Sequence, residues 1–265
     1  MKKLAAALCA LMLLVACSPA SSKVLILATT TSTADTGLLD VLNAEFARLH
    51  PGWTVKIVAV GTGEALKLGE RKDCDVLLVH ARESEEAFLA AGFGVNRRDV
   101  MYNDFVLLGP GHDPAGVKGA ASLVEALQLL GNSSFLFVSR GDNSGTHRKE
   151  IELWKQAGLV PGGESYLSTG QGMGETLRIA SDKAGYTLSD RGTYLATSNL
   201  DLAVVFQGDP LLRNEYGVIE VKGAKNPDGA RAYAEFLVSS VAQGIIADFG
   251  KDRFGQPLFY PNAGR

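Results

Sequence analysis

Short apolar segments typical of buried strands alternate along this chain with longer segments whose apolar residues recur at helical spacing. The pattern predicts a strand at residues 24–27, a helix at 35–49 and a strand at 53–60. A helix at 64–71 and a buried strand at 75–79 continue it. A β-α-β-α-β order favours a mostly parallel sheet that is covered by helices. The sequence therefore predicts an α/β fold.

A second alternating series follows, and it indicates a second lobe. Residues 101–110 form a long extended run, and residues 216–221 form another near the C-terminal end. We interpret these runs as the two places where the chain crosses between lobes. A chain of 265 residues is long enough for two modest domains with separate cores. The predicted first lobe comprises residues 23–107 and 216–265, and the predicted second lobe comprises residues 108–215.

The first residues have the composition of a bacterial targeting segment. A pair of lysines is followed by an apolar stretch at residues 4–16, which is too short to span a membrane. The letters LVAC, which end at Cys17, resemble a lipobox, and a small polar linker follows them. We therefore expect a signal peptide at residues 1–16, lipidation of Cys17, and a linker at residues 17–22. The alternatives are an ordinary signal peptide with a chance cysteine, or a short membrane anchor.

This segment predicts a lipid-anchored protein in the periplasm or on the outer face of the cell membrane. The cysteines agree with that location. Once Cys9 leaves with the signal peptide and Cys17 carries lipid, Cys74 alone remains, so we expect no internal disulfide. Cys74 stands directly before a buried strand pattern, which favours a packed thiol over a nucleophile.

Composition argues against nucleic acid as a partner. The chain has 26 lysine and arginine residues against 29 aspartate and glutamate residues, for a net charge of −3. A domain that binds nucleic acid usually carries a basic excess. If the protein binds an anion, it does so against its own net charge, so local donors must hold the ligand.

Hydroxyl and glycine residues gather where predicted strands end and helices begin. These junctions are residues 29–33, 61–63, 144–146, 170–174 and 189–193. In an α/β sheet such junctions lie at the carboxyl ends of strands, and the unpaired N–H groups of a first helical turn suit an anion. The alternative for the first junction is that Thr31 or Ser32 only caps a helix. Because the junctions occur in both predicted lobes, we expect a cleft with an anion between two walls, and plain caps at some junctions.

The loop at residues 139–147 is the richest of these junctions in polar groups. Arg140 offers a planar pair of charged donors that suits an oxyanion. The alternative role for Arg140 is an ion pair with Asp142, or a place on the surface. Asp142 would then orient the guanidinium. The sequence of this loop is compatible with both roles of Arg140.

Several common catalytic and nucleotide-binding motifs are absent from the sequence of these loops. Neither the glycine turn at residues 61–63 nor the one at 170–174 continues into a P-loop or completes G-x-G-x-x-G. The four histidines are scattered, which favours structural roles over metal binding, so we expect no metal and no cofactor. Ser144 and His147 are three residues apart, close enough to touch on one helical turn. An exported ester hydrolase that uses this pair is the alternative from another functional class.

Motifs along most of the chain, taken in order, resemble those of the tungstate-binding proteins of ABC importers. The motifs are Thr29-Thr30-Thr31-Ser32, Asp35-Thr36-Gly37-Leu38-Leu39, Val60-Gly61-Thr62-Gly63, Met101-Tyr102-Asn103-Asp104-Phe105, Ser139-Arg140-Gly141-Asp142, Ser144-Gly145-Thr146-His147, Gly170-Gln171-Gly172-Met173, and the stretch from Tyr186 to Tyr194. As a set these motifs are specific, although each alone is weak.

The resemblance implies a type II periplasmic-binding-protein fold, in which two α/β lobes close over an oxyanion in the cleft between them. It implies tungstate as the ligand, with molybdate as the close competitor, and an ABC permease and ATPase as partners. By analogy with the family, oxygens of the ligand are held by the threonine-rich run, the Thr62 turn and the second-lobe loop, and Arg140 favours tungstate. The expected ligand-binding residues are Thr30, Thr31, Ser32, Thr62, Arg140, Ser144, Gly145 and Thr146.

We expect a monomer that binds without chemistry. Donors without acceptors select a fully ionised oxyanion, whereas a carboxylate in the site would favour a protonated one such as phosphate. Asp35 and Asp142 are the residues that could reverse this preference. The alternatives within the same class are receptors for molybdate, sulfate or phosphate, and a lipid-anchored sensor that signals the closed state is a further alternative.

Overall fold

The computed structural model describes residues 23–264, with the exception of the side chain of Ser32. The predicted signal peptide, the lipidation site at Cys17 and the linker lie outside the described residues. Within residues 23–264, no helix combines the length and the apolar character needed to cross a membrane. Cys74 is buried, and burial raises the pKa of its thiol to about 12, so the thiol stays protonated and packed.

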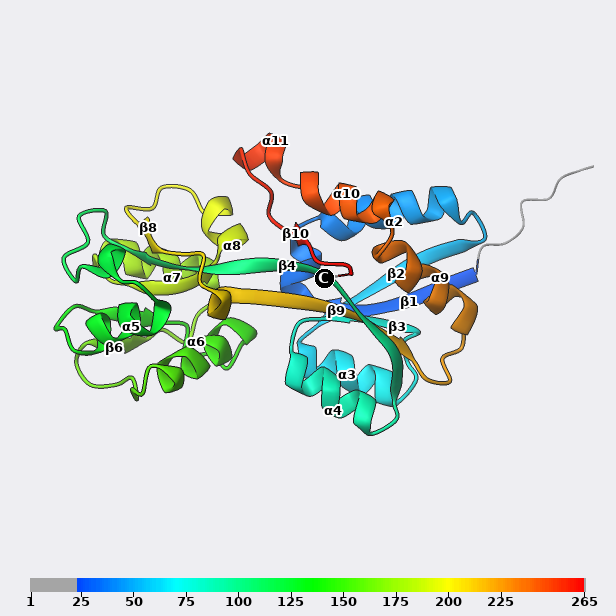
Figure 1. The fold of residues 1–265 in the computed structure, drawn as a ribbon, viewed down its shortest axis with the longest axis horizontal. Helices are drawn as coiled ribbons and strands as arrows, with labels where there is room; N and C mark the ends of the chain where they lie inside the picture. Colours follow the sequence, from blue (N-terminus) through cyan, green and yellow to red (C-terminus); the bar gives the residue numbers. More distant parts are fainter. Residues whose placement is uncertain (1–22, 265) are drawn as a thin grey trace, which may run out of the picture.

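A mixed sheet forms one half of the molecule (Figure 1). Its strands, in spatial order, are β2 (Trp53–Val60), β1 (Lys23–Thr30), β3 (Val76–Val79), β9 (Arg213–Val221), β4 (Gly94–Gly109) and β10 (Tyr260–Pro261). β1 is parallel to β2 and β3, whereas β9 is antiparallel to β3 and β4, and β10 is antiparallel to β4. The α/β class is confirmed. The sheet is mixed instead of mostly parallel, because β9 brings the chain back in the opposite direction.

Helices cover both faces of this sheet. They are α1 (Thr31–Asp35), α2 (Leu38–Leu49), α3 (Thr62–Glu70), α4 (Arg82–Ala90), α9 (Pro227–Leu237), α10 (Ser240–Asp248) and α11 (Lys251–Phe254). On one face α2, α9 and α10 pack around Phe46, Tyr233 and Ile246. On the other face α3 and α4 pack Leu66 and Phe88 against the sheet. Figure 1 shows α3 and α4 on the opposite side of the strands from α2 and α10.

The second half is built on the continuation of β4. Beyond Asp104, β4 pairs antiparallel with β7 (Thr187–Asp190) and β8 (Ala203–Phe206). β5 (Phe137–Ser139) and β6 (Tyr166–Ser168) form a separate parallel pair. The helices of this half are α5 (Leu123–Gly131), α6 (Gly145–Gln156), α7 (Met173–Asp182) and α8 (Arg191–Ala196), with short 3-10 helices η1 (Val117–Gly119) and η2 (Pro210–Leu212).

β4 and β9 are the strands that run between the two halves (Figure 1). Val100 and Met101 on β4 pack into the core of the first half, whereas Phe105 and Leu107, a few residues later, pack into the core of the second. We refer to the half with β1–β3 as the first lobe and to the half with β5–β8 as the second lobe. The carboxyl end of each lobe's parallel strands is where the predicted ligand-binding junctions fall.

The helix predicted at residues 35–49 corresponds to α2, which begins three residues later, at Leu38, and the short helix α1 precedes it as a separate element. α1 ends at Asp35 and α2 begins at Leu38, because Gly37 has φ +83°, a left-handed conformation that stops the first helix. The hydroxyl of Thr36 stabilises the break by donating to the Thr33 carbonyl and accepting from the Leu38 N–H. β1 also extends to Thr30, three residues beyond the predicted strand, since it pairs with β2 along its whole length.

Candidate functional site

The first wall of the candidate site lies at the carboxyl ends of three adjacent parallel strands. Thr30 ends β1, and its register partner on β2 is Val60, after which Thr62 begins α3. His80 directly follows β3. The strand register therefore brings the threonine-rich run, the Thr62 turn and His80 to one edge of the sheet.

Thr30 is the best-anchored residue of this wall. Its side chain is 4% exposed, and its hydroxyl oxygen caps α1 by accepting the N–H of Thr33. The same oxygen lies 2.6 Å from Oγ1 of Thr33 and 3.2 Å from Nε2 of His80. The cap that sequence reasoning offered to Thr31 or Ser32 thus belongs to Thr30, and Thr31 is exposed in the first turn of α1. Thr29 is turned into the core, where its hydroxyl donates to the Leu78 carbonyl.

The second wall is the loop between β5 and α6. Ser144 is the N-cap of α6, and its hydroxyl accepts the N–H of His147 at 3.3 Å. Gly145 and Thr146 form the first turn of α6, with Gly145 exposed and Thr146 half-buried. Helix α6 has twelve residues, so its N-terminal N–H groups carry a substantial partial positive charge.

Arg140 forms the ion pair with Asp142 that the sequence offered as an alternative. A second donor of its guanidinium group, Nε, takes no part in this pair. Nη2 of its guanidinium donates to Oδ2 of Asp142 at 2.5 Å. Its Nε atom is buried and has no hydrogen-bond partner among the described residues. A buried, charged donor without an acceptor is costly, so this atom marks a place where an acceptor is expected.

Asp142 has both of its oxygens engaged. Oδ2 accepts from Arg140, and Oδ1 accepts the N–H of Ser144 at 3.1 Å. Partial burial raises the pKa of the carboxyl group, but the hydrogen bonds from Ser144 and the charge of Arg140 outweigh it, so the pKa lies below its ordinary value. Asp142 is therefore ionised, and each of its oxygens accepts a hydrogen bond from its own loop. Asp35 is exposed at the end of α1.

The two walls approach each other at His80 and Gly145. A Cβ atom placed on Gly145 would lie 3.6 Å from Cε1 of His80, which is ordinary van der Waals contact. The first turn of α6 in the second lobe therefore meets the end of β3 in the first. The predicted residues thus fall into two groups, Thr30, Thr31, Ser32 and Thr62 on one wall and Arg140, Ser144, Gly145 and Thr146 on the other.

The two remaining junctions have internal roles. The N–H of Gly170 donates to the Arg140 carbonyl at 2.7 Å, so the loop after β6 supports the second wall. Asp190 caps α8 through the N–H and hydroxyl of Thr193, both at 2.8 Å. Arg191 is bound by Asp104 on β4 and by Oε1 of Gln207.

Sequence reasoning missed His80, which it considered only as a possible metal ligand. Nδ1 of His80 lies 2.9 Å from Oδ1 of Asn214 on β9, and the ring packs against Tyr216 with centroids 4.7 Å apart. Burial lowers the pKa of the imidazole to about 4, although the hydrogen bond with Asn214 opposes this, so the ring is neutral at physiological pH. Its position directly after a buried strand was the one signal in the sequence that pointed to it.

The Ser144–His147 pair lacks the geometry of an activated nucleophile. The contact between the two residues is made by the backbone N–H of His147, while Nδ1 of its ring accepts the N–H of Asn143 at 2.9 Å. A general base must instead accept the hydroxyl proton of the serine through a free ring nitrogen. The described residues also contain no cluster of three or more metal-ligating side chains.

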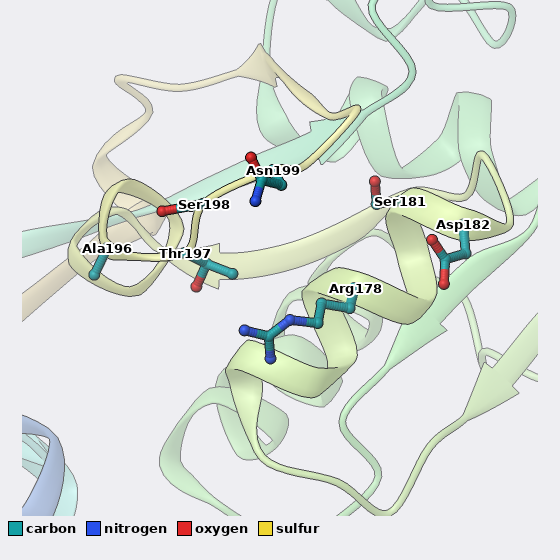
Figure 2. Close-up of a pocket in the computed structure, with 7 residues that line it drawn as sticks. All are labelled: Arg178, Ser181, Asp182, Ala196, Thr197, Ser198 and Asn199. Carbon is teal, nitrogen blue, oxygen red and sulfur yellow. The ribbon is translucent and has the colours of Figure 1, made fainter.

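A polar depression of about 480 Å³ lies elsewhere on the second lobe. Figure 2 shows Arg178, Ser181 and Asp182 projecting from α7 opposite residues 196–199. The Arg178 side chain is 59% exposed and lies 3.6 Å from the carboxylate of Glu175. With one carboxylate beside its arginine and Asp182 in its lining, this depression is a poorer match for an anion than the two walls.

Comparisons with known proteins agree on one family. A model described as a PBP superfamily domain matches residues 18–241. The tungstate-binding protein TupA of Peptoclostridium acidaminophilum is 48% identical over 248 residues, which cover 91% of this chain and 86% of that protein. The solved structure of the tungstate-binding protein TupA from Desulfovibrio alaskensis G20 is 44% identical, with a TM-score of 0.84 over 91% of this chain and 100% of that one. The solved tungstate ABC transporter protein from Geobacter sulfurreducens is 48% identical, with a TM-score of 0.74 over 86% and 100% of the two chains.

Proposed function

The chain belongs to the PBP superfamily and, within it, to the tungstate-binding proteins, and from that premise we propose that it captures tungstate outside the cytoplasm and delivers it to an ABC permease. It is a binding protein and not an enzyme. The ligand is a tetrahedral dianion, and molybdate is its close competitor because the two anions share shape and charge. The observation that carries the proposal is the buried Nε of Arg140 beside the N-terminus of α6, which has no hydrogen-bond partner within the described part of the chain.

Both walls supply donors to the proposed ligand. The second lobe offers charged, hydroxyl and backbone donors, from Arg140, Ser144, Gly145 and Thr146. The hydroxyl groups of Thr31 and Thr62 offer donors from the first, and Thr30 and Ser32 are the sequence neighbours of Thr31. An oxyanion that accepts hydrogen bonds from both lobes has a higher affinity for the closed state, so binding drives closure.

The state of Asp142 supports selection of a fully ionised anion. Phosphate at neutral pH retains a hydroxyl group whose proton needs an acceptor. Asp142 is the carboxylate of the second wall, and both its oxygens already accept hydrogen bonds from Arg140 and Ser144. A protonated oxyanion would have to compete with Arg140 and Ser144 for this acceptor, which costs free energy.

The proposal also includes how the protein is anchored and which parts of it form the two lobes. We infer that Cys17 carries the lipid anchor, so that Cys17→Ser would release the protein from membranes. Residues 23–107 with 216–265 act as one lobe and residues 108–215 as the other, in a monomer. The extended crossing strands β4 and β9 are where these lobes would hinge.

Isothermal titration of the purified protein with tungstate, molybdate, sulfate and phosphate tests the proposal. We expect tungstate and molybdate to bind about 5- to 150-fold more tightly than phosphate, because a single unpaired buried donor costs about 1–3 kcal/mol. Phosphate binding tighter than tungstate would overturn the assignment. A chromogenic phosphate or sulfate ester serves as the control for the hydrolase alternative, and turnover that Ser144→Ala abolishes would revive that alternative.

A further inference from the structure

A network of partly buried hydrogen bonds connects the first wall to both strands that join the lobes. Oγ1 of Thr30 lies 3.2 Å from Nε2 of His80, and Nδ1 of His80 lies 2.9 Å from Oδ1 of Asn214. The amide nitrogen of Asn214 donates to Oδ1 of Asn103 at 2.8 Å and to the hydroxyl of Tyr216 at 3.3 Å. Asn103 on β4 and Asn214 on β9 are register partners. These hydrogen bonds therefore connect the turn after β1, through His80, with the two crossing strands.

The donors in this hydrogen-bond network determine which ring nitrogen of His80 carries the hydrogen. Because the amide nitrogen of Asn214 donates to two other groups, its Oδ1 atom is the acceptor that faces His80. Nδ1 of His80 must then carry the hydrogen, and a neutral imidazole with a protonated Nδ1 has a bare Nε2. That bare nitrogen accepts the hydroxyl hydrogen of Thr30, while the Thr30 oxygen accepts from Thr33.

We propose that His80 is a positioning residue for the oxyanion site: as a neutral ring protonated on Nδ1, it accepts the Thr30 hydroxyl hydrogen and holds the turn that begins α1 against strand β9. The inference rests on the proposed function, and it deepens it by assigning different roles to neighbouring residues. Thr30 acts by placing the turn, and Thr31 and the second wall supply hydrogens to the ligand. The same ring lies close to Gly145 in the first turn of α6, since a Cβ atom placed there would be in van der Waals contact with it, so one side chain connects the turn with the crossing strands and faces the opposite wall.

The protonation pattern of His80 is directly measurable. In the full-length chain labelled with ¹⁵N-histidine, we expect one imidazole with protonated Nδ1 and unprotonated Nε2 at neutral pH, and we expect tungstate to leave that pattern unchanged. The signal is assigned by its loss in His80→Gln. A protonated Nε2 in the tungstate complex would overturn the proposal, because that nitrogen could not then accept the Thr30 hydroxyl hydrogen.

A double-mutant cycle measures whether Thr30 acts through His80. We expect Thr30→Val and His80→Phe each to weaken tungstate binding about tenfold, and the double variant to be no weaker than either one, since both remove the same link. His80→Gln keeps an acceptor that can reach Thr30, and we expect it to recover most of the affinity. Independent, multiplying losses would show that Thr30 contacts the ligand by itself and would overturn the proposal.

These outcomes are separate from the test of the proposed function. Failure of the unchanged protein to bind tungstate would reject the function, while the ¹⁵N pattern of His80 would still be readable in the free protein. Circular dichroism and the unfolding midpoint of each variant without ligand distinguish misplacement of the turn from loss of the fold. If His80→Phe does not fold, the cycle is repeated with His80→Asn, which is shorter and also lacks an acceptor within reach of Thr30.

Discussion

The two walls of the candidate site are held in place by different interactions. In the first wall, Thr30 is buried, ends a central strand, and is connected through His80 to the crossing strands. In the second wall, Arg140 and Asp142 form a local ion pair on a loop, and the nearest strand, β5, is only three residues long. The first wall has its geometry fixed by the sheet, whereas the second carries the fixed charge.

This difference separates two requirements of an anion receptor. Geometry set by buried, neutral hydrogen bonds adds no charge that a ligand would have to displace. In the proposed function, charge on a loop approaches the ligand as the lobes close. Asp142 holds the Arg140 guanidinium by a hydrogen bond. We therefore expect changes in the first wall to act through stability and position, and changes in the second wall to act mainly through affinity.

The largest expected effect concerns the first wall and acidic pH. His80 has a folded-state pKa of about 4 against an ordinary value of 6.5, so between these values the unfolded chain binds a proton that the folded protein does not. The contribution of His80 to the free energy of unfolding should therefore fall as pH decreases from 6.5 to 4, by at most about 3 kcal/mol, and change no further below that range. Tyr216, which faces the ring, has a raised pKa because of burial and stays neutral throughout this range.

Urea unfolding at a series of pH values measures this dependence. His80→Gln removes the titrating group and should flatten the curve between pH 6.5 and 4. His112→Gln, at an exposed histidine of the second lobe, is the matched control and should leave the slope unchanged. A slope that persists in His80→Gln would assign the acid sensitivity to another group and weaken the contrast between the walls.

The next largest effect concerns the charge of the second wall. Arg140→Ala should weaken tungstate binding by about 2 kcal/mol, or about thirtyfold, because a charged hydrogen bond to the anion is lost. Stability should change little, since the pair with Asp142 is local and partly exposed. Titration calorimetry with tungstate and molybdate gives both affinities, and any preference between the two anions should narrow.

Arg178→Ala is the control for this experiment, because it removes an equal charge from the remote depression in Figure 2. It should leave affinity within a factor of two. If Arg140→Ala and Arg178→Ala had the same effect, the role of Arg140 would be limited to the general field of the protein, and the second wall would not be a wall of the site.

Much of the fold could be predicted because apolar periodicity reports burial. β2 has the bounds that its pattern predicted, and β3 lies within the strand predicted at residues 75–79. The break between α1 and α2 could not be predicted in this way. Apolar residues continue at helical spacing beyond it, and only the left-handed backbone of Gly37 reveals the interruption. The insertion of β9 between β3 and β4 likewise depends on pairings across more than a hundred residues.

The candidate site was only partly visible in the sequence, for a similar reason. Hydroxyl-rich junctions are recognisable because their residue types are local, so both walls could be proposed. The role of His80 depends on Asn214, which is 134 residues away, and on the strand register that pairs Asn214 with Asn103. Which hydroxyl caps and which faces the cleft also depends on where β1 ends, and the predicted strand ended too early.

The third effect tests how tightly the second wall is supported. Gly141 has φ +62°, and a Cβ atom there would overlap the hydroxyl of Ser168 and lie 2.9 Å from its Cβ. Gly170 has φ +66° with open space around it, so it is a matched control. Both alanine variants bear the left-handed backbone strain of about 1–2 kcal/mol. Gly141→Ala should lose about 1 kcal/mol more in urea unfolding, because the loop is also pushed off β6.

Gly141→Ala should also weaken tungstate binding more than Gly170→Ala, because Arg140 is the adjacent residue and moves with the loop. Equal affinities of the two variants would mean that the guanidinium adapts to the displaced backbone. The second wall would then be flexible, and its contrast with the rigid first wall would become larger.

The smallest effect tests the exposed part of the first wall. Thr31→Val keeps the size of the side chain but removes its hydroxyl, and we expect tungstate affinity to fall by about 1 kcal/mol, or about fivefold, with no change in the unfolding midpoint. Thr31→Ser should restore the affinity because it returns the hydroxyl. Unchanged affinity in Thr31→Val would leave backbone N–H groups as the donors of this turn. The exposed turn of the first wall would then bind the ligand through its backbone alone, which would sharpen its difference from the charged side chain of the second wall.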